Sequence, residues 1–361
     1  MRNLRRTLLS PYHYAFAVLS ALWYGFPARK LTVIGVTGTK GKSTVTDLIY
    51  ATLLECGYAV AAASTIRFAI KGESRPNLFK MTLPGRGFIQ KFLARAVKEG
   101  CTHAVVEITS EAALQHRHLF LELDALVFTN LQKEHVESHG SFENYAAAKL
   151  LIGKELIKSS KRPRAIIANA DDPASIPYLA LPVEEKIPFS YADAKDVELS
   201  SGRAAFSFGG VPFRMQLPGS FTVMNALAAA KAAQFAGASL ENIAEALAKI
   251  ERVPGRTERI EAGQEFQAVV DYAHTPDSLA ALYAAYPGRK ICVLGNTGGG
   301  RDAWKRPEMG RIADTLCEKV ILTNEDPYDE DPCAILDAMA KGMKRAPDII
   351  IDRREAIRAA L

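Results

Sequence analysis

The chain has 361 residues, of which 48% are hydrophobic and 24% charged, and its formal net charge is +5. This composition is close to the average of a soluble globular protein, and the length allows about two or three ordinary domains with sizeable cores. The mild charge, without clustered Lys and Arg between aromatic residues, argues against a nucleic-acid partner and is compatible with small anionic ligands.

The first 30 residues form a short basic and apolar segment. Three arginines within the first six residues precede the apolar stretch 14–26, and Arg29 and Lys30 follow it. The stretch is shorter than the roughly 20 residues that span a bilayer. Two interpretations stay open: a helix packed on the protein's own core, and an interfacial helix that makes peripheral contact with a membrane.

The scattered cysteines, without a C-x-x-C pair, fit a reducing cytoplasm.

From residue 31 onward, short apolar strands alternate with helices. This alternation is typical of a parallel sheet with helices on both faces, so we expect an α/β fold. The expected strands are 31–36, 58–64, 103–109, 124–130 and 164–172, and the expected helices are 42–56, 86–99 and 141–158.

The following region has a different pattern. Residues 187–217 alternate in short runs around Gly209 and Gly210, which predicts small antiparallel strands on an edge. Helices are expected at about 222–236 and 239–250, and Ser239 is the expected N-cap of the second.

The segment 253–260 is polar and punctuated by proline and glycine, so we place a domain boundary there. We expect a central P-loop domain at 31–253 and a smaller, Rossmann-like C-terminal domain at 254–361. The expected strands of the second domain are 267–274, 290–295 and 319–324. An open parallel sheet would normally continue beyond the last helix-like run, so this domain is expected to be incomplete.

A candidate phosphate-binding loop, GVTGTKGKST, occupies residues 35–44 between the first strand and the first helix. Its glycines allow the backbone to aim N–H groups at phosphate oxygens, and the helix that follows adds its N-terminal dipole. Lys42 is expected at the β- and γ-phosphates and the Ser43 hydroxyl at Mg²⁺. The nucleotide loop would then consist of Gly38, Thr39, Lys40, Gly41, Lys42, Ser43 and Thr44. The alternative is a glycine-rich turn with a solvated lysine.

This loop resembles that of the Mur ligases and their relatives, the folylpolyglutamate synthases, whose pattern is G-x-x-G-T-x-G-K-[ST]-T. Lys40 stands where the family usually has Asn. Further motifs resemble the branch that adds the third residue to the peptidoglycan stem peptide, and the resemblance extends over about residues 31–358. These motifs are EITSEAALQHR at 107–117, FTNLQKEHVESHG at 128–140, YAAAK at 145–149, NADD at 169–172, PGSFTVMNALAA at 218–229, GRTERI at 255–260, DYAHTPDSL at 271–279 and GNTGGGRDAWKRPEMG at 295–310.

The resemblance implies ATP-dependent amide synthesis with Mg²⁺ as a cofactor. A carboxylate of a muramoyl-peptide-like acceptor would attack the γ-phosphate of ATP, and the amine of a free amino acid would displace the acyl phosphate. Positioning and charge neutralisation are the main requirements of such phosphoryl transfer. Two alternatives stay open: a folylpolyglutamate synthase-like ligase, and an ATP-binding subunit that needs a partner protein.

The resemblance also assigns metal and catalytic residues. Glu107 ends an apolar strand, at the carboxyl edge where α/β sheets bind ligands, and it matches a Mg²⁺ ligand. His135 matches the family's metal-binding histidine. Lys149 matches a lysine that is commonly carbamylated in the family, and the carbamate would bind a second Mg²⁺ or orient the acyl phosphate. The expected metal residues are thus Ser43, Glu107, His135 and Lys149, and the expected catalytic residues are Lys42, His135 and Lys149.

Two further groups of residues match ligand-binding positions of the family. The first group is expected to bind ATP, near the adenine or when the domains close: Asn225, Arg256, Asp271 and His274. The second group is expected to hold the acceptor: Thr82, Ser110, Gln115 and Arg117. Arg117 offers a fork that suits a carboxylate or a phosphate. Glu111 stands where the family has a histidine, which alters the expected acceptor contacts.

The chain departs from the family in two places that concern its substrates. The family's acceptor-binding N-terminal domain has no counterpart before residue 31, which leaves open whether the acceptor carries UDP or a lipid. The family's D-N-P-R selector for meso-diaminopimelate corresponds to 324–332, NEDPYDEDP. Tyr328 takes the place of its arginine, and Asp326 lies nearby among other acids. We therefore expect a cationic amino acid such as lysine to be preferred, unless the acidic run is only a solvated loop.

Overall fold

The computed structural model describes residues 2–79, 81–134 and 136–361, without the side chains of residues 2–8, 136 and 138. The chain divides into two compact units. Unit 1 comprises Met1–Gln132, Glu143–Leu199 and Arg203–Glu258, and unit 2 comprises Lys133–Phe142, Ser200–Gly202 and Arg259–Leu361. Unit 1 therefore continues a few residues past the predicted boundary at 253, and the domain bounds given above stay a prediction.

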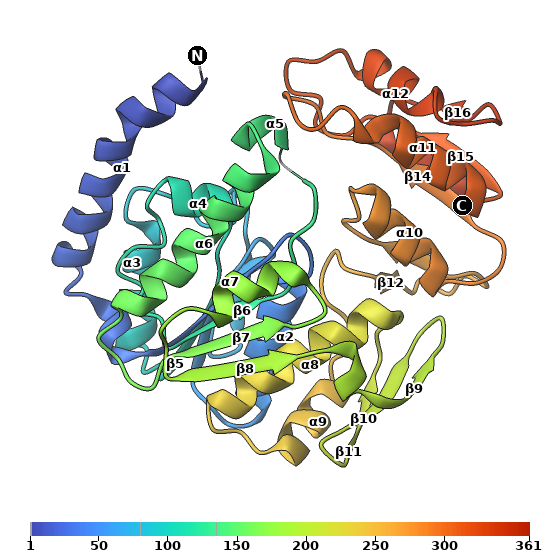
Figure 1. The fold of residues 1–361 in the computed structure, drawn as a ribbon. Helices are drawn as coiled ribbons and strands as arrows, with labels where there is room; N and C mark the ends of the chain where they lie inside the picture. Colours follow the sequence, from blue (N-terminus) through green and yellow to red (C-terminus); the bar gives the residue numbers. More distant parts are fainter. Residues whose placement is uncertain (1, 80, 135) are drawn as a thin grey trace. The chain divides into compact units, whose positions relative to one another are not determined.

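A mixed sheet forms the centre of unit 1 (Figure 1). Among the described residues it has eight strands in the order β4-β3-β2-β5-β1-β6-β7-β8. β2, β5, β1, β6 and β7 run parallel, as predicted, and β8 pairs in parallel with β7. β3 and β4 form an antiparallel hairpin at one edge that the sequence pattern did not indicate. The bounds are β1 Thr32–Thr37, β2 Val60–Ala63, β3 Arg67–Ile70, β4 Glu73–Pro76, β5 His103–Glu107, β6 Ala125–Phe128, β7 Ala165–Asn169 and β8 Glu185–Phe189.

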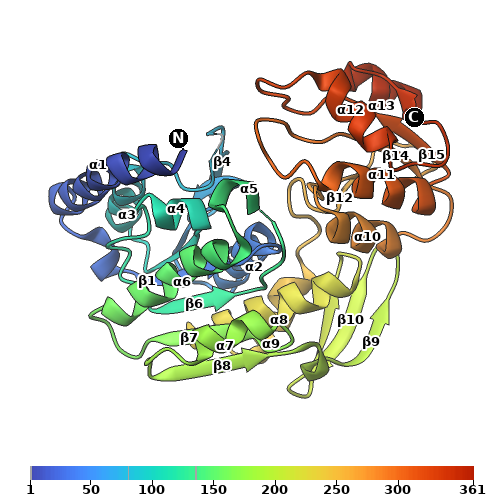
Figure 2. The same ribbon diagram turned by 45° about the horizontal axis from the view of Figure 1, so that its top comes forward.

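Helices cover both faces of this sheet, as the alternation of strands and helices predicts (Figures 1 and 2). Successive residues of a strand point to opposite faces, so Val33 and Ile34 of β1 belong to two different apolar cores. The first core contains α2 Lys42–Glu55, α8 Ser220–Phe235 and α9 Leu240–Ala248. The second contains η1 Pro27–Lys30, α3 Phe88–Lys98, α4 Ser110–Leu114, α6 Phe142–Lys158 and α7 Ile176–Leu179.

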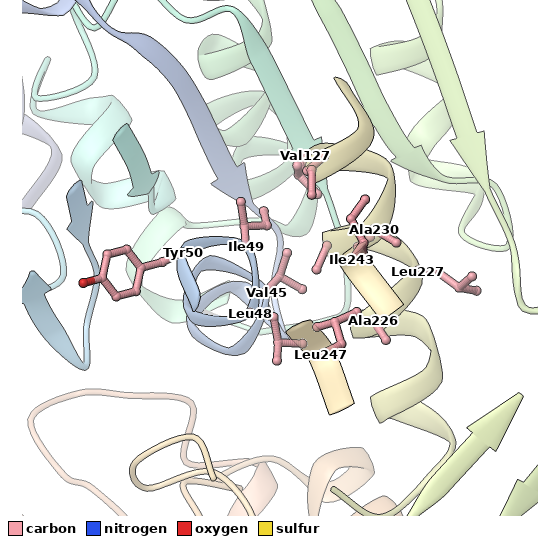
Figure 3. Packing of buried hydrophobic residues seen from close by; sticks show 14 of the residues in the cluster. Val45, Leu48, Ile49, Tyr50, Val127, Ala226, Leu227, Ala230, Ile243 and Leu247 are labelled. Carbon is pink, nitrogen blue, oxygen red and sulfur yellow. The ribbon is translucent and has the colours of Figure 1, made fainter. Parts of the chain in front are cut away.

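The first core fixes the helix that follows the glycine-rich loop. Figure 3 shows Val45 and Leu48 of α2 next to Ala226 of α8 and to Ile243 and Leu247 of α9, all of them buried. The alanines of α8 allow the two helix backbones to approach closely, so little space is left for α2 to shift. The core thus holds the start of α2 at a defined place at the end of β1.

The region after β8 corrects one expectation. The predicted antiparallel strands exist as β9 Lys195–Leu199, β10 Ala204–Phe208 and β11 Val211–Met215, but they form a sheet of their own. The first strand of the predicted region, β8, pairs in parallel with β7 instead. Phe206 and Phe213 are buried in the first core, so packing of one apolar face, rather than pairing with an edge strand, positions this small sheet.

Unit 2 is a second α/β unit, as predicted. β14 Ile291–Leu294, β15 Lys319–Leu322 and β16 Asp348–Ile349 pair in parallel. Leu294, Met309, Leu322 and Met339 lie in its core. A separate pair joins β12 Glu258–Ile260 and β13 Ala268–Val270. The helices are α5 Val136–His139, α10 Pro276–Ala285, α11 Lys305–Leu316, α12 Pro332–Ala340 and α13 Arg353–Ala360.

The N-terminal segment forms α1 Arg2–Trp23, which lies beside α3 in both views (Figures 1 and 2). Ala21 is fully buried, and the helix leads through η1 into β1. None of the helices in the described part of the chain has the length and apolar character needed to cross a membrane. Two further 3₁₀ turns complete unit 1, η2 Pro173–Ser175 and η3 Tyr191–Asp193.

Candidate active site

The glycine-rich loop connects β1 to α2, and two of its glycines are required by close contacts. Gly38 has φ 148° and Gly41 has φ 79°, values that side chains disfavour. A Cβ atom on Gly38 would lie 2.0 Å from Thr129 Oγ1, and one on Gly41 would lie 2.6 Å from Asn225 Oδ1. The loop is therefore a tight turn at the N-terminus of a helix, and Asn225, predicted to bind near the adenine, lies against it.

The segment after β6 holds this loop in shape. Asn130 accepts hydrogen bonds from Thr39 N at its backbone oxygen (2.8 Å) and from Lys40 N at its side-chain oxygen (2.9 Å). The Thr129 hydroxyl donates to the Lys40 carbonyl at 2.6 Å. Thr129 and Asn130 belong to the motif FTNLQKEHVESHG, which predicts no role for them. Their position directly after a predicted parallel strand, at the edge of the β1 loop, is the signal that could have identified them.

Ser43 and Glu107 form the centre of the site. Ser43 Oγ donates to Glu107 Oε1 at 3.0 Å, and the Thr65 N–H donates to Glu107 Oε2 at 2.8 Å. The Glu107 side chain is 1% exposed. A hydroxyl and a carboxylate side by side are the oxygen donors that Mg²⁺ prefers, so the pair fits the predicted metal. The third predicted ligand, His135, lies outside the described residues. The described part of the chain contains no group of three or more His, Cys, Asp or Glu arranged as a metal site.

Two lysines donate hydrogen bonds to backbone carbonyls of the loop: Lys42 from the loop itself and Lys149 from α6. Lys42 Nζ donates to the Thr39 carbonyl at 2.8 Å, so this side chain lies back over the loop. Lys149, on α6 and only 1% exposed, donates to the Gly38 carbonyl at 2.5 Å and lies 4.8 Å from the centre of the Tyr145 ring. The Tyr145 hydroxyl is in turn 3.1 Å from Thr39 Oγ1. In this arrangement the Lys149 ammonium supports the loop, and its carbamylation stays a prediction.

The remaining predicted nucleotide residues fall in two places. In unit 1, Arg256 Nη2 lies 3.3 Å from Ser43 Oγ. In unit 2, Asp271 accepts a hydrogen bond from Ala273 N at 2.6 Å, and His274 Nε2 lies 2.7 Å from Glu134 Oε1. The structure thus brings Arg256 to the loop and gives Asp271 and His274 partners within their own unit. Their contact with ATP stays a prediction.

The predicted acceptor residues surround the carboxyl ends of β2 and β5. The hydroxyls of Thr82 and Thr65 lie 2.7 Å apart, which connects Thr82 through Thr65 to Glu107. Ser110 is buried and begins α4. Hydrogen bonds through Glu107 and Thr65 therefore connect Thr82, a predicted acceptor residue, to Ser43 of the glycine-rich loop.

Gln115 and Arg117 form a second group on this side. Gln115 Nε2 donates to Glu111 Oε1 at 2.6 Å, and its own oxygen accepts from Arg117 Nη2. Arg117 Nη1 donates to the Leu83 carbonyl at 2.8 Å. The guanidinium thus lies between the segment after β4 and the end of α4, where it presents a positive charge beside Thr82.

The predicted amino-acid loop lies in unit 2. Asp326 and Tyr328 have positive φ values of 32° and 54°, and Tyr328 is 53% exposed. A Cβ on Gly299 would lie 3.0 Å from the Tyr328 ring, and Arg301 Cζ lies 5.9 Å from the ring centre. Arg301 belongs to the motif GNTGGGRDAWKRPEMG and has no predicted role in the sequence. Its guanidinium lies near the tyrosine that is predicted to take the place of the family's arginine.

Part of the acidic run has structural partners. Glu330 accepts hydrogen bonds from Arg306 Nη2 at 2.7 Å and from Gly300 N at 3.1 Å. Asp331 is the N-cap of α12 and accepts from Cys333 N at 3.0 Å. These two carboxylates hold the loop, so part of the acidic run has a structural role.

A parallel α/β sheet with a glycine-rich loop, an adjacent lysine and a hydroxyl–carboxylate pair defines a P-loop nucleotide-binding protein. The Mur ligase middle domain family matches residues 36–233, and the Mur ligase glutamate ligase domain family matches residues 255–361. The chain belongs to the Mur ligases, which are ATP-dependent amide ligases.

Individual relatives support the resemblance to the branch that adds the third residue of the stem peptide. The chain is 38% identical over 364 residues to the UDP-N-acetylmuramoyl-L-alanyl-D-glutamate–2,6-diaminopimelate ligase of Syntrophomonas wolfei, covering 96% of this chain and 73% of the relative. It is 36% identical over 376 residues to the UDP-N-acetylmuramyl-tripeptide synthetase of Roseiflexus sp. strain RS-1, covering 96% of this chain and 74% of the relative.

Solved structures agree with this assignment. A UDP-N-acetylmuramoyl-L-alanyl-D-glutamate–2,6-diaminopimelate ligase superposes with a TM-score of 0.62 at 31% identity, covering 91% of this chain and 70% of that one. The folylpolyglutamate synthase of Mycobacterium tuberculosis gives a TM-score of 0.79 at 16% identity, covering 96% of this chain and 86% of that one. At that identity the second likeness concerns the fold alone.

Proposed function

We propose that this chain binds ATP at residues 38–44 and joins a free amino acid to the carboxylate of a muramoyl-peptide-like acceptor, in the synthesis of a peptidoglycan precursor. One observation carries the proposal. The Ser43–Glu107–Thr65–Thr82 hydrogen bonds connect the nucleotide loop to the predicted acceptor side. A γ-phosphate at the loop would therefore lie next to an acceptor carboxylate held beside Thr82 and Arg117.

The reaction has two steps. An acceptor carboxylate oxygen bonds to the γ-phosphorus while the bond to the β-phosphate oxygen breaks, which yields an acyl phosphate and ADP. The amino-acid amine then attacks the carbonyl carbon, inorganic phosphate leaves, and the amine loses a proton. The loop amides, Lys42 and Arg256 would bind and neutralise the phosphates, because positioning and electrostatics supply most of the catalysis in phosphoryl transfer.

Ser43 and Glu107 would hold Mg²⁺, with His135 and Lys149 as further members of the metal set. A bound Mg²⁺ neutralises phosphate charge. Lys149 orients the loop through the Gly38 carbonyl, and as a carbamate it would become an anion able to take part in metal binding. Asn225, Asp271 and His274 are proposed to complete the ATP site, and Thr82, Ser110, Gln115 and Arg117 the acceptor site.

The test is ADP release by the isolated chain, with the product identified by mass spectrometry. The reaction mixture would contain ATP, Mg²⁺, UDP-muramoyl dipeptide and pooled amino acids. We expect ADP release that requires both acceptor and amine, and a product heavier by one amino-acid residue. Release that needs folate and glutamate instead would favour the folylpolyglutamate synthase-like alternative. Activity only after adding a second protein would favour the partner-dependent alternative.

We propose a cationic amino acid, such as lysine, as the preferred substrate. Tyr328 takes the place of the arginine that pairs with the distal carboxylate of meso-diaminopimelate, and the exposed Asp326 and Asp329 lie on the same loop. The competing substrate is meso-diaminopimelate, because several relatives are named for 2,6-diaminopimelate and Arg301 lies near Tyr328. Comparing kcat/KM for L-lysine and meso-diaminopimelate decides between them. A clear preference for the diacid contradicts the proposal, and Tyr328→Arg is expected to shift selectivity toward it.

We also propose a cytoplasmic location with peripheral membrane contact through residues 1–30. The outer face of α1 carries exposed apolar side chains at helical spacing, Leu9, Tyr12, Phe16, Leu19 and Trp23, the last 81% exposed. Asp47 is the first acidic residue of the chain, so every charged side chain in residues 1–30 is a lysine or an arginine. The full chain should sediment with anionic vesicles more than with neutral ones, and the double change F16E/L19E should abolish this. Equal partitioning of both proteins would end the idea.

A further inference from the structure

The inner face of α1 contacts the segment that carries two predicted acceptor residues. Ser10 Oγ lies 2.9 Å from His116 Nε2, and the Tyr14 ring packs edge-on against the His116 ring with 5.7 Å between centres. His116 stands between Gln115 and Arg117. Near its other end, α1 is fixed by a close contact of Ser20 with Gly87, because a Cβ on Gly87 would lie 2.7 Å from Ser20 Cβ. α1 is therefore held in place on the acceptor side of unit 1.

The backbone of His116 needs such support. The residue has φ 57°, in the left-handed region that glycine adopts easily and other residues adopt with strain. Its N–H donates to the Ala113 carbonyl at 3.1 Å, and the Arg117 N–H donates to the Ala112 carbonyl at 2.9 Å. This turn ends α4 and reverses the chain. Contacts that fix the His116 ring therefore also fix the turn from which Gln115 and Arg117 extend.

The turn directs Arg117 toward the predicted acceptor side. One N–H donor of its guanidinium has no hydrogen-bond acceptor among the described residues. Its Nη1 and Nη2 donate to Leu83 and Gln115, whereas its buried Nε has no hydrogen-bond acceptor among the described residues. His13, on the same face of α1, lies in this group. Burial, and then the positive charge of Arg117, lower the pKa of His13, and Glu111 opposes them. The Arg117 guanidinium thus offers an N–H donor for an anionic acceptor group next to the face of α1 that carries Ser10 and Tyr14.

We propose that α1 forms a wall of the acceptor site, in which Ser10 and His116 position Arg117. The inference rests on the proposed function, because the acceptor role of Gln115 and Arg117 is part of it. It adds that residues of α1 determine the affinity for the acceptor, whatever covers the outer face of the helix. The ligand chemistry is an anionic group of the acceptor, a carboxylate or a phosphate.

The test is steady-state kinetics of the full chain with UDP-muramoyl dipeptide, ATP and the preferred amino acid. His116→Ala and Ser10→Ala should raise the KM for the acceptor, by about tenfold and threefold respectively, because each removes a contact that fixes the turn. The KM for ATP and kcat should change little. His116→Asn should recover part of the loss, because asparagine tolerates the left-handed region and can accept a hydrogen bond from Ser10. Leu22→Gln, at an exposed position of α1, is the matched control and should leave the acceptor KM unchanged.

The outcomes separate this inference from the proposed function. If the wild-type chain turns over and Ser10→Ala and His116→Ala, both folded by circular dichroism, keep the wild-type acceptor KM, the inference is wrong. A loss in kcat with an unchanged acceptor KM also overturns it. If the wild-type chain shows no turnover, the proposed function fails. In that case calorimetric titration with the same UDP-muramoyl dipeptide decides the inference: weaker binding by His116→Ala than by wild type supports it, and equal or absent binding contradicts it.

Discussion

At the scale of single residues, Glu107 is the carboxylate that connects the glycine-rich loop to the predicted acceptor residues. It is almost fully buried and accepts hydrogen bonds from Ser43 and from the backbone of Thr65. Burying a charged carboxylate costs free energy, which hydrogen bonds or a nearby cation must offset. A metal at this pair would explain why the charge is kept.

Glu107→Gln tests this interpretation. The amide keeps the size of the side chain and loses its charge, so ADP release should fall by about 10- to 100-fold and the Mg²⁺ concentration for half-maximal rate should rise. Glu55→Gln, an exposed glutamate at the end of α2, is the control and should behave as wild type. An unchanged Mg²⁺ dependence in Glu107→Gln would show that this carboxylate does not hold the metal.

Gly38 provides a second test at this scale. Alanine at this position would both adopt an unfavourable φ and bring its Cβ to 2.0 Å from Thr129 Oγ1, so the loop would have to shift. We expect Gly38→Ala to lose most of its ATP affinity, measured by calorimetry. Gly57→Ala is the matched control, because Gly57 also has a positive φ but no atom within 4 Å of its Cβ. It should cost about 1–2 kcal/mol of stability and leave ATP binding intact.

The loop residues could be predicted from the sequence because glycine spacing and a following helix are local features. The contacts of Thr129, Asn130 and Asn225 with that loop depend on which strands and helices lie next to β1, and a single sequence does not give this order. For the same reason, Lys149 looks like an ordinary helical lysine in the sequence and becomes a buried group under Gly38 in the structure.

At the scale of elements, most strands and helices were predictable because their apolar periodicity is strong. The hairpin β3–β4 was missed, since every residue of β4 is exposed and the strand has no apolar face to detect. β8 was assigned to the small antiparallel sheet because its alternation is similar, whereas pairing with β7 puts it in the central sheet. Local pattern indicates a strand but not its partner.

Ser239 permits a prediction about α9, one of the helices that hold α2. Its side chain caps the helix by accepting a hydrogen bond from Asn242 N. Ser239→Ala should lower the free energy of unfolding by about 1 kcal/mol, measured by thermal or denaturant unfolding. Ser239→Asp, which can still cap the helix, should retain the stability. ATP turnover by the alanine variant should stay normal at a temperature where it is folded, and a large loss of turnover would mean that α9 contributes to the site directly.

At the scale of the whole molecule, the predicted site residues divide between two units. Unit 1 contains the nucleotide loop, the Ser43–Glu107 pair and the predicted acceptor residues, while unit 2 contains the loop around Tyr328. This division matches a reaction in which one substrate is activated and a second one is then added. The glycine-rich loop can be predicted from local glycine spacing, whereas the choice of amino acid is proposed to depend on a few side chains of the loop around Tyr328.

The transfer of oxygen from acceptor to phosphate tests the central claim most directly. The acceptor carboxylate would be labelled with ¹⁸O, and the inorganic phosphate released during turnover would be analysed by mass spectrometry. If the chain forms an acyl phosphate and then an amide, each phosphate carries one oxygen from the acceptor carboxylate, and the amount of labelled phosphate equals the amount of product. Unlabelled phosphate released together with ADP would show that the chain hydrolyses ATP without activating the acceptor, which would contradict the account.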